Sequence, residues 1–147
     1  MKKVVFFIGT LNPGGAETKL IRYILPYFSG EKDIKPMLLV LRDEGSLTGS
    51  VPEGVEVFCV NEEITTGLHA SVYRTRRILK KIRPDVVVSF MWYPAVISYL
   101  VRQAGFIHFR HIVHETVNMT EHLNDVFRQG RFNPLKLFLI KKGICRR

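Results

Sequence analysis

A glycine-rich loop near the N-terminus carries the clearest chemical signal in the sequence. It reads Gly9-Thr10-Leu11-Asn12-Pro13-Gly14-Gly15-Ala16-Glu17, and it follows the apolar stretch 4–8. Two adjacent glycines at the start of a helix let the backbone pass close to a ligand. They also leave the first N–H groups free for an anion, most naturally a phosphate. The alternative is a glycine-rich turn between a strand and a helix that holds no ligand.

Two familiar phosphate-binding motifs do not fit this loop. A dinucleotide-binding fingerprint requires G-x-G-x-x-G, but the residue two after Gly9 is Leu11. A P-loop has Lys and then Ser or Thr after its last glycine, whereas Gly14 is followed by Gly15 and Ala16. We therefore expect neither a nicotinamide cofactor nor Walker-type hydrolysis of a nucleoside triphosphate.

His114 is the second candidate, because it ends the β-type segment 109–114. Side chains alternate along an extended chain, so His111 and His114 take opposite faces and cannot chelate one metal together. His-x-x-His-Glu is also not the helical His-Glu-x-x-His arrangement of zinc enzymes, and we expect no metal. His114 either contacts a ligand or is a structural histidine. The adjacent Glu115 either acts in the same site or caps the next segment.

Aromatic residues form a third group, in the run Phe90-Met91-Trp92-Tyr93 that we expect to end a strand. Trp92 and Tyr93 have the flat apolar faces on which a sugar ring stacks. Aromatic residues at a strand end also commonly belong to the core. Both interpretations remain open on the sequence alone.

The elements that position these residues follow from hydrophobic patterning. Continuous apolar stretches without alternation predict strands buried on both faces of a parallel sheet, at 4–8, 37–41, 55–60, 85–90 and 109–114. Helical spacing of apolar residues predicts helices within 20–28, 72–82, 96–101 and 135–140. This alternation predicts an α/β, Rossmann-like, doubly wound parallel sheet with helices on both faces.

Such a sheet binds its ligands beyond the carboxyl ends of the strands, where the strand order switches direction. The segments 10–15, 90–93 and 114–116 follow three of the predicted strands. We therefore expect these three segments to face one crevice.

Composition and charge narrow the class of protein. The chain has 147 residues, 46% of them hydrophobic and 24% charged, so disordered and low-complexity architectures are excluded and one domain with a real core is expected. Two cysteines are too few for a disulfide scaffold. The initial apolar run is too short for a signal peptide, and the uncharged stretch 86–101 is too short to span a bilayer. We expect a cytoplasmic protein, at most peripheral to the inner face of the membrane.

The net charge of +9 predicts attraction to something anionic. Much of the excess lies between positions 74 and 83, where six basic residues occur in a predicted helix. Such a run is either a solvated helix face or a surface that contacts anionic lipid. No helix-turn-helix, RNA-binding aromatic motif or zinc finger accompanies it, so we expect no nucleic-acid partner.

Taken in order, these motifs resemble the N-terminal region of group 1 family glycosyltransferases of the GT-B fold. The strand before Asn12-Pro13-Gly14-Gly15-Ala16-Glu17 and the amphipathic helix after it look like the opening of that family. Arg83-Pro84-Asp85-Val86-Val87-Val88-Ser89 and Arg110-His111-Ile112-Val113-His114-Glu115 look like two of its later strands.

The resemblance implies two Rossmann-like domains that face each other across a cleft. Residues 1–147 are then the N-terminal, acceptor-side domain, truncated before the C-terminal domain that binds the nucleotide-sugar donor. The full-length protein is expected to transfer a hexosyl group from a nucleotide-sugar to a glycan or lipid acceptor of the cell envelope. Transfer in the family is retaining and metal-independent and uses no cofactor, and this fragment alone is expected to be inactive.

The resemblance also assigns roles to residues. Gly14 and Gly15 approach the donor diphosphate, and His114 lies beside the reacting sugar as the catalytic residue. The residues expected on the acceptor side are Asn12, Trp92, Tyr93 and Glu115.

Two other functions remain as alternatives. One is a non-catalytic Rossmann-like binding module whose basic surface contacts an anionic partner. The other is an unrelated α/β nucleotide-binding enzyme.

Overall fold

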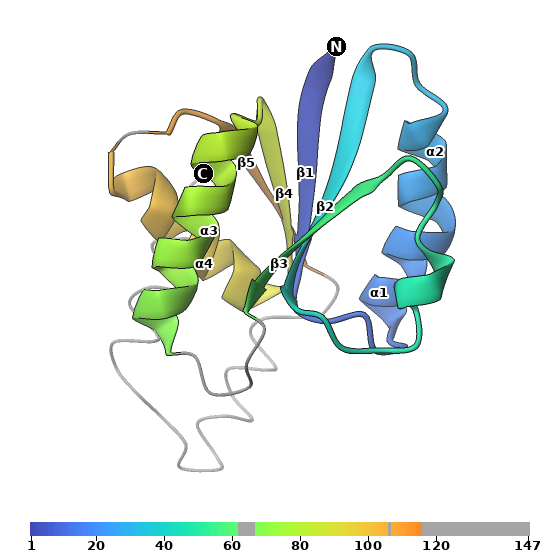
Figure 1. Cartoon of the computed structure of the whole chain (residues 1–147), viewed down its shortest axis with the longest axis horizontal. Coiled ribbons are helices and arrows are strands. Elements are labelled where there is room, and N and C mark those ends of the chain that lie inside the picture. Colours follow the sequence, from blue (N-terminus) through green and yellow to red (C-terminus); the bar gives the residue numbers. More distant parts are fainter. Residues whose placement is uncertain (62–66, 106, 116–147) are drawn as a thin grey trace.

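The centre of the molecule is a parallel sheet of five strands in the order β3-β2-β1-β4-β5 (Figure 1). The structure is a computed structural model that describes residues 1–61, 67–105 and 107–115. The strands are β1 (Lys2–Ile8), β2 (Ile34–Arg42), β3 (Glu56–Asn61), β4 (Val86–Phe90) and β5 (Arg110–His114). The chain moves outward from β1 to β3 and then returns to the other side of β1 for β4 and β5. This order confirms the predicted doubly wound, Rossmann-like fold class.

Helices cover both faces of the sheet (Figure 1). One face carries a continuous helical segment, and the other carries two separate helices. The segment comprises α1 (Gly15–Lys19), the π-helical turn η1 (Leu20–Ile24) and α2 (Leu25–Ser29), while the opposite face holds α3 (Leu68–Ile82) and α4 (Trp92–Gln103). Among the helices of the described residues, none combines the length and the apolar character needed to cross a bilayer.

The π-helical turn η1 has a cause in the sequence. Pro26 has no backbone N–H, and in a regular α-helix its ring would collide with the carbonyl group four residues earlier. The wider turn over Leu20–Ile24 comes directly before this proline. The segment therefore continues past Pro26 and ends at Ser29, whose hydroxyl donates a 2.8 Å hydrogen bond to the Leu25 carbonyl.

The central strand β1 shows why its sequence has no alternation. Val4, Phe6 and Ile8 pack on the side of α1, η1 and α2. Val5 and Phe7 pack on the side of α3 and α4. Because both faces are covered, every position of the apolar run is buried, as expected for a strand inside a parallel sheet.

The structure corrects one predicted boundary. Trp92 and Tyr93 do not end the fourth strand, because β4 ends at Phe90 and α4 begins at Trp92. Pro94 lies in the first turn of α4, where its missing N–H costs nothing because first-turn N–H groups have no partner within the helix. The helix predicted within 135–140 and the end of the segment 114–116 lie outside the described residues.

Candidate functional site

A pocket of about 210 Å³ opens where the carboxyl ends of β1, β2 and β4 meet. It lies at the switch in strand order between β1 and β4, where this type of sheet binds its ligands. Its walls come from the loop after β1, the end of β2 and the start of α4. The lining residues are Gly9, Thr10, Glu17, Leu41, Arg42, Met91, Trp92, Tyr93 and Pro94. The lining combines the Arg42 guanidinium and the Glu17 carboxylate with the Thr10 hydroxyl and two aromatic rings that carry polar groups. Such a lining suits a polar ligand that contains a flat ring.

The glycine-rich loop is held in place by the segment that follows β2. Leu11 is fully buried, its N–H donates to the Glu44 carbonyl at 2.7 Å, and its own carbonyl accepts from Leu47 N–H at 3.1 Å. The carbonyl of Gly9 accepts a 3.0 Å bond from the backbone N–H of Arg42. Backbone hydrogen bonds therefore hold Gly9 and Leu11 against the end of β2 and the segment that follows it. The exposed part of the loop, around Asn12, lies between Leu11 and α1.

Gly14 and Gly15 differ in what surrounds them. Gly14 is the N-cap of α1, and a side chain added there would meet the carboxylate of Glu17, which folds back over it. A Cβ added at Gly15 would have no atom within 4 Å among the described residues. The backbone at Gly15 thus faces open space, whereas an anion at Gly14 has to displace the Glu17 carboxylate.

The turn between β4 and α4 is strained. Met91 has φ 66° and ψ 166°, a left-handed conformation that non-glycine residues rarely adopt and that costs about 1–3 kcal/mol. Its N–H donates to the His114 carbonyl at 3.1 Å, which ties the turn to the end of β5. The turn directs the half-buried Trp92 and Tyr93 into the pocket lining, with their rings edge to face at 5.2 Å.

His114 lies next to the pocket but does not line it. The register pairs Phe90 with His114, and the two rings pack with centroids 4.8 Å apart. Its Nε2 atom is buried and has no hydrogen-bond partner among the residues that the structure describes. An imidazole nitrogen in this state is available to a hydroxyl or a carbonyl group, because buried polar atoms are normally paired.

His111 lies on the opposite face of β5, as the alternation predicts. Its Nε2 is 3.0 Å from the Ser89 hydroxyl, which is 2.8 Å from the Ser98 hydroxyl, and both serines are fully buried. Burial, with a smaller contribution from the Arg102 charge, lowers the pKa of His111 from 6.5 to about 4. His111 is therefore neutral at pH 7 and links α4 to the sheet.

The structure brings together some of the predicted site residues but not all. Trp92 and Tyr93 share the pocket with Gly9 and Thr10, which joins two of the three expected segments. The predicted residues outside the described lining are Asn12, Gly14, Gly15, His114 and Glu115. Asn12 is exposed, and its side-chain amide donates to the Thr10 hydroxyl at 3.4 Å.

Several lining residues were not among the predicted site residues, Arg42 and Met91 included. Arg42 is the last residue of β2, and a basic residue at the carboxyl end of a buried strand is a signal that was available. Its guanidinium is 3.6 Å from the Glu44 carboxylate. Met91 has no such signal, because its residue type does not favour a positive φ.

The chain resembles known proteins in its fold and not in its sequence. No family model matches the chain, and no curated protein sequence matches it. Among solved structures, the apo form of the lipopolysaccharide outer core galactosyltransferase WaaB matches with a TM-score of 0.65 and 14% identity, over 81% of this chain and 34% of that one.

Two further structures contain UDP. MnaA of S. aureus matches with a TM-score of 0.55 and 14% identity, over 76% of this chain and 30% of that one. A ugt transferase from Siraitia grosvenorii in complex with UDP matches with a TM-score of 0.55 and 13% identity, over 88% of this chain and 32% of that one.

These matches show a shared fold. The chain spans about a third of the length of each of the three structures. It has the Rossmann-like α/β fold of a domain found in glycosyltransferases, which agrees with the resemblance to GT-B enzymes noted in the sequence motifs.

Proposed function

We propose that the chain is the N-terminal, acceptor-side domain of a GT-B glycosyltransferase. With a C-terminal donor-binding domain, it would transfer a hexosyl group from a nucleotide-sugar to a glycan or lipid acceptor. The observation that carries this proposal is the pocket at the strand-order switch, lined by both the glycine-rich loop and the aromatic start of α4. The two structures of the same fold that hold UDP support a nucleotide-sugar as the donor.

The donor diphosphate is assigned to the start of the helical segment 15–29. Gly15 has open space where a side chain would be, so a phosphate oxygen can approach its backbone. The first N–H groups of the segment have no partner within the helix and carry the positive end of its dipole. Gly14 has no side-chain cap, and the Glu17 carboxylate over it would swing aside when the diphosphate arrives.

The acceptor is assigned to the aromatic side of the pocket. Trp92 and Tyr93 offer ring faces for stacking against a sugar, and the exposed amide of Asn12 offers hydrogen bonds to hydroxyl groups. Glu115 follows β5 directly and supplies a carboxylate on the same edge of the sheet. These contacts would position the acceptor hydroxyl close to the donor sugar.

His114 is assigned to the reacting sugar. Its buried Nε2 has no partner among the described residues, so it can form a hydrogen bond with a sugar hydroxyl or with developing charge. The Phe90 ring and the Met91 N–H fix the strand end that carries it. The departing diphosphate would be stabilised by backbone N–H groups here and by basic side chains of the second domain, without a metal.

A titration with UDP-hexoses in the presence of a donor-binding domain, followed by the amide chemical shifts of this chain, tests the proposal. We expect shifts at residues 9–17, at the Trp92 indole and at 91–93, because these groups surround the pocket. Gly15→Val should abolish the shifts at 9–17 without unfolding the chain, because the added Cβ meets no atom within 4 Å among the described residues.

Gly49→Val is the matched control, since a Cβ at Gly49 also meets no atom within 4 Å and the residue lies outside the pocket lining. It should leave the titration unchanged. Shifts that spread over other surfaces, or that survive Gly15→Val, would contradict the assigned donor position.

A further inference from the structure

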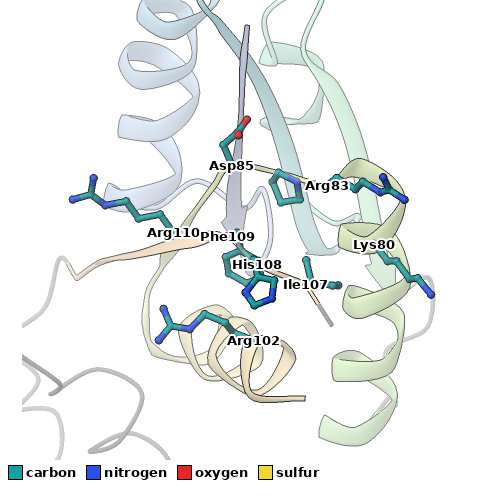
Figure 2. Close-up of a pocket in the computed structure, with 9 residues that line it drawn as sticks. Lys80, Arg83, Asp85, Arg102, Ile107, His108, Phe109 and Arg110 are labelled. Atoms are coloured by element: carbon teal, nitrogen blue, oxygen red, sulfur yellow. The ribbon is translucent and has the colours of Figure 1, made fainter. Parts of the chain in front are cut away.

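A second and larger hollow lies at the opposite end of the sheet. It measures about 640 Å³ and is bounded by the ends of α3 and α4 and by the starts of β4 and β5 (Figure 2). Asp85 comes directly before β4, and Arg110 is the first residue of β5. We call this the basic groove, and its lining residues are Lys80, Arg83, Pro84, Asp85, Arg102, Ile107, His108, Phe109 and Arg110.

The charges in the basic groove are strongly unbalanced. Four side chains are cationic, namely Lys80, Arg83, Arg102 and Arg110, and only Asp85 is anionic. The Asp85 carboxylate is already engaged, because it accepts a 2.8 Å hydrogen bond from the backbone N–H of Lys3. Among the described residues, none of the four cationic groups has a carboxylate within 4.0 Å, the ion pairs being elsewhere on the sheet.

The cationic groups stand on two sides of the groove. In Figure 2 the side chains of Arg102 and Arg110 extend to one side, those of Lys80 and Arg83 extend to the other, and His108 lies between them. These five side chains are all exposed. A ligand that carries several negative charges could pair with the cationic side chains on both sides at once.

The floor of the groove indicates a polar ligand. Ile107 and Phe109 are only 7% and 8% exposed, and Pro84 is buried. These three apolar side chains offer a partner little area to cover, so a ligand in the groove would mainly contact the charged side chains around them. Charge complementarity is left as the main source of affinity and selectivity.

We propose that the basic groove binds a phosphate-bearing polyanion. Guanidinium groups pair with phosphate oxygens through two parallel hydrogen bonds, and three of the four cationic groups are arginines. The phosphates come either from a soluble polyphosphate or from the headgroups of anionic lipids. This site lies at the amino ends of β4 and β5, away from the pocket at the carboxyl ends of β1, β2 and β4, and does not depend on the proposed function.

Calorimetric titration with inorganic tripolyphosphate at low salt tests the site. The double variant Arg102→Gln/Arg110→Gln removes one side of the groove, and we expect at least a tenfold loss of affinity, because charge-assisted hydrogen bonds contribute more than neutral ones. The control Arg22→Gln/Lys32→Gln removes the same charge from exposed positions outside the groove and should change affinity less than about twofold by screened long-range effects.

A variant with higher expected affinity for tripolyphosphate complements the loss-of-charge variants. Asp85→Asn removes the single carboxylate, while its amide oxygen can still accept the hydrogen bond from Lys3. We expect tighter tripolyphosphate binding for Asp85→Asn and no change for Asp33→Asn, which lies outside the groove lining. Thermal melts of all four variants confirm that each remains folded.

Co-sedimentation with vesicles of phosphatidylglycerol and phosphatidylcholine distinguishes the two sources. Binding to tripolyphosphate with no retention on vesicles supports a soluble ligand. Retention on phosphatidylglycerol vesicles that is lost in Arg102→Gln/Arg110→Gln supports a lipid headgroup. Binding to neither, or binding that the groove and control variants reduce equally, overturns the proposal.

Discussion

Replacing Gly45 by alanine tests how the glycine-rich loop is held. Gly45 has φ +126°, and an added Cβ would overlap with the backbone of Leu11 and Asn12. Leu11 cannot easily move, because its N–H and its carbonyl both form backbone hydrogen bonds and its side chain is fully buried. Gly45→Ala therefore combines an unfavourable backbone conformation with overlap against a fixed neighbour.

The expected cost is about 2–4 kcal/mol of the free energy of unfolding. For a chain of this size each kcal/mol lowers the melting temperature by about 2–4 °C, so the melting temperature should fall by about 5–15 °C. Urea unfolding followed by circular dichroism measures the free energy, and the melt measures the temperature. Gly49→Ala is the control, because its Cβ meets no atom within 4 Å, and it should stay within about 0.5 kcal/mol of the parent.

The same variant should also alter the loop. Because Gly45→Ala pushes on Leu11 and Asn12, the amide shifts of residues 9–15 should change more than those of the core strands. An unfolding free energy for Gly45→Ala equal to that of Gly49→Ala would refute the argument that the segment after β2 anchors this loop.

Single contacts also determine the expected effects of changes at four other residues. Gly15→Ala should raise the free energy of unfolding by up to about 1 kcal/mol, because it reduces the freedom of the unfolded chain and meets no obstacle; a lower melting temperature would contradict this. Ser89→Ala should cost about 1–3 kcal/mol in urea unfolding by leaving His111 and Ser98 without their shared partner, and a neutral result would remove the network's structural role. The pKa of His111 is about 4 in the folded chain against 6.5 as its ordinary value, so the unfolded state binds more protons between these values. The stability that comes from keeping His111 neutral is therefore fully present above pH 6.5, and the free energy of unfolding falls by about 2–3 kcal/mol as the pH drops to 4. His111→Phe should flatten this pH profile. His114→Ala, assayed with a donor-binding domain present, should lower turnover about tenfold or more through loss of one hydrogen bond, and unchanged turnover would reject its assigned role.

The fold was largely predictable from hydrophobic patterning. The unbroken apolar run at 4–8 is covered on both faces by helices, as a parallel sheet requires. The alternation of strands and helices, with right-handed connections, predicted an open parallel sheet with helices on both faces, whereas the order of the strands came from the structure. The predicted strand end at Phe90 was right, but Trp92 and Tyr93 were wrongly expected to belong to that strand end, because aromatic residues suit strands and helix starts equally.

From the sequence, only the position of the candidate site at the carboxyl edge of the sheet was predictable. The end of β1 and the start of α4 share the pocket because the strand order brings them together, which the sequence pattern implies. The Glu17 carboxylate over Gly14 and the position of His114 beside the pocket are tertiary arrangements that no spacing reveals. The sequence places Arg42 at the end of a buried strand, but its contact with the pocket depends on β2 ending level with the glycine-rich loop, which the strand register sets.

We place the nucleotide-sugar at the switch in strand order between β1 and β4. A crystal structure with a donor-binding domain present, grown with a UDP-hexose, would reveal that position. We expect diphosphate density against the backbone of Gly15, with the sugar between that loop and the Trp92 ring. Density confined to any other surface, the basic groove included, with the pocket empty, would mean that the diphosphate does not bind at Gly15.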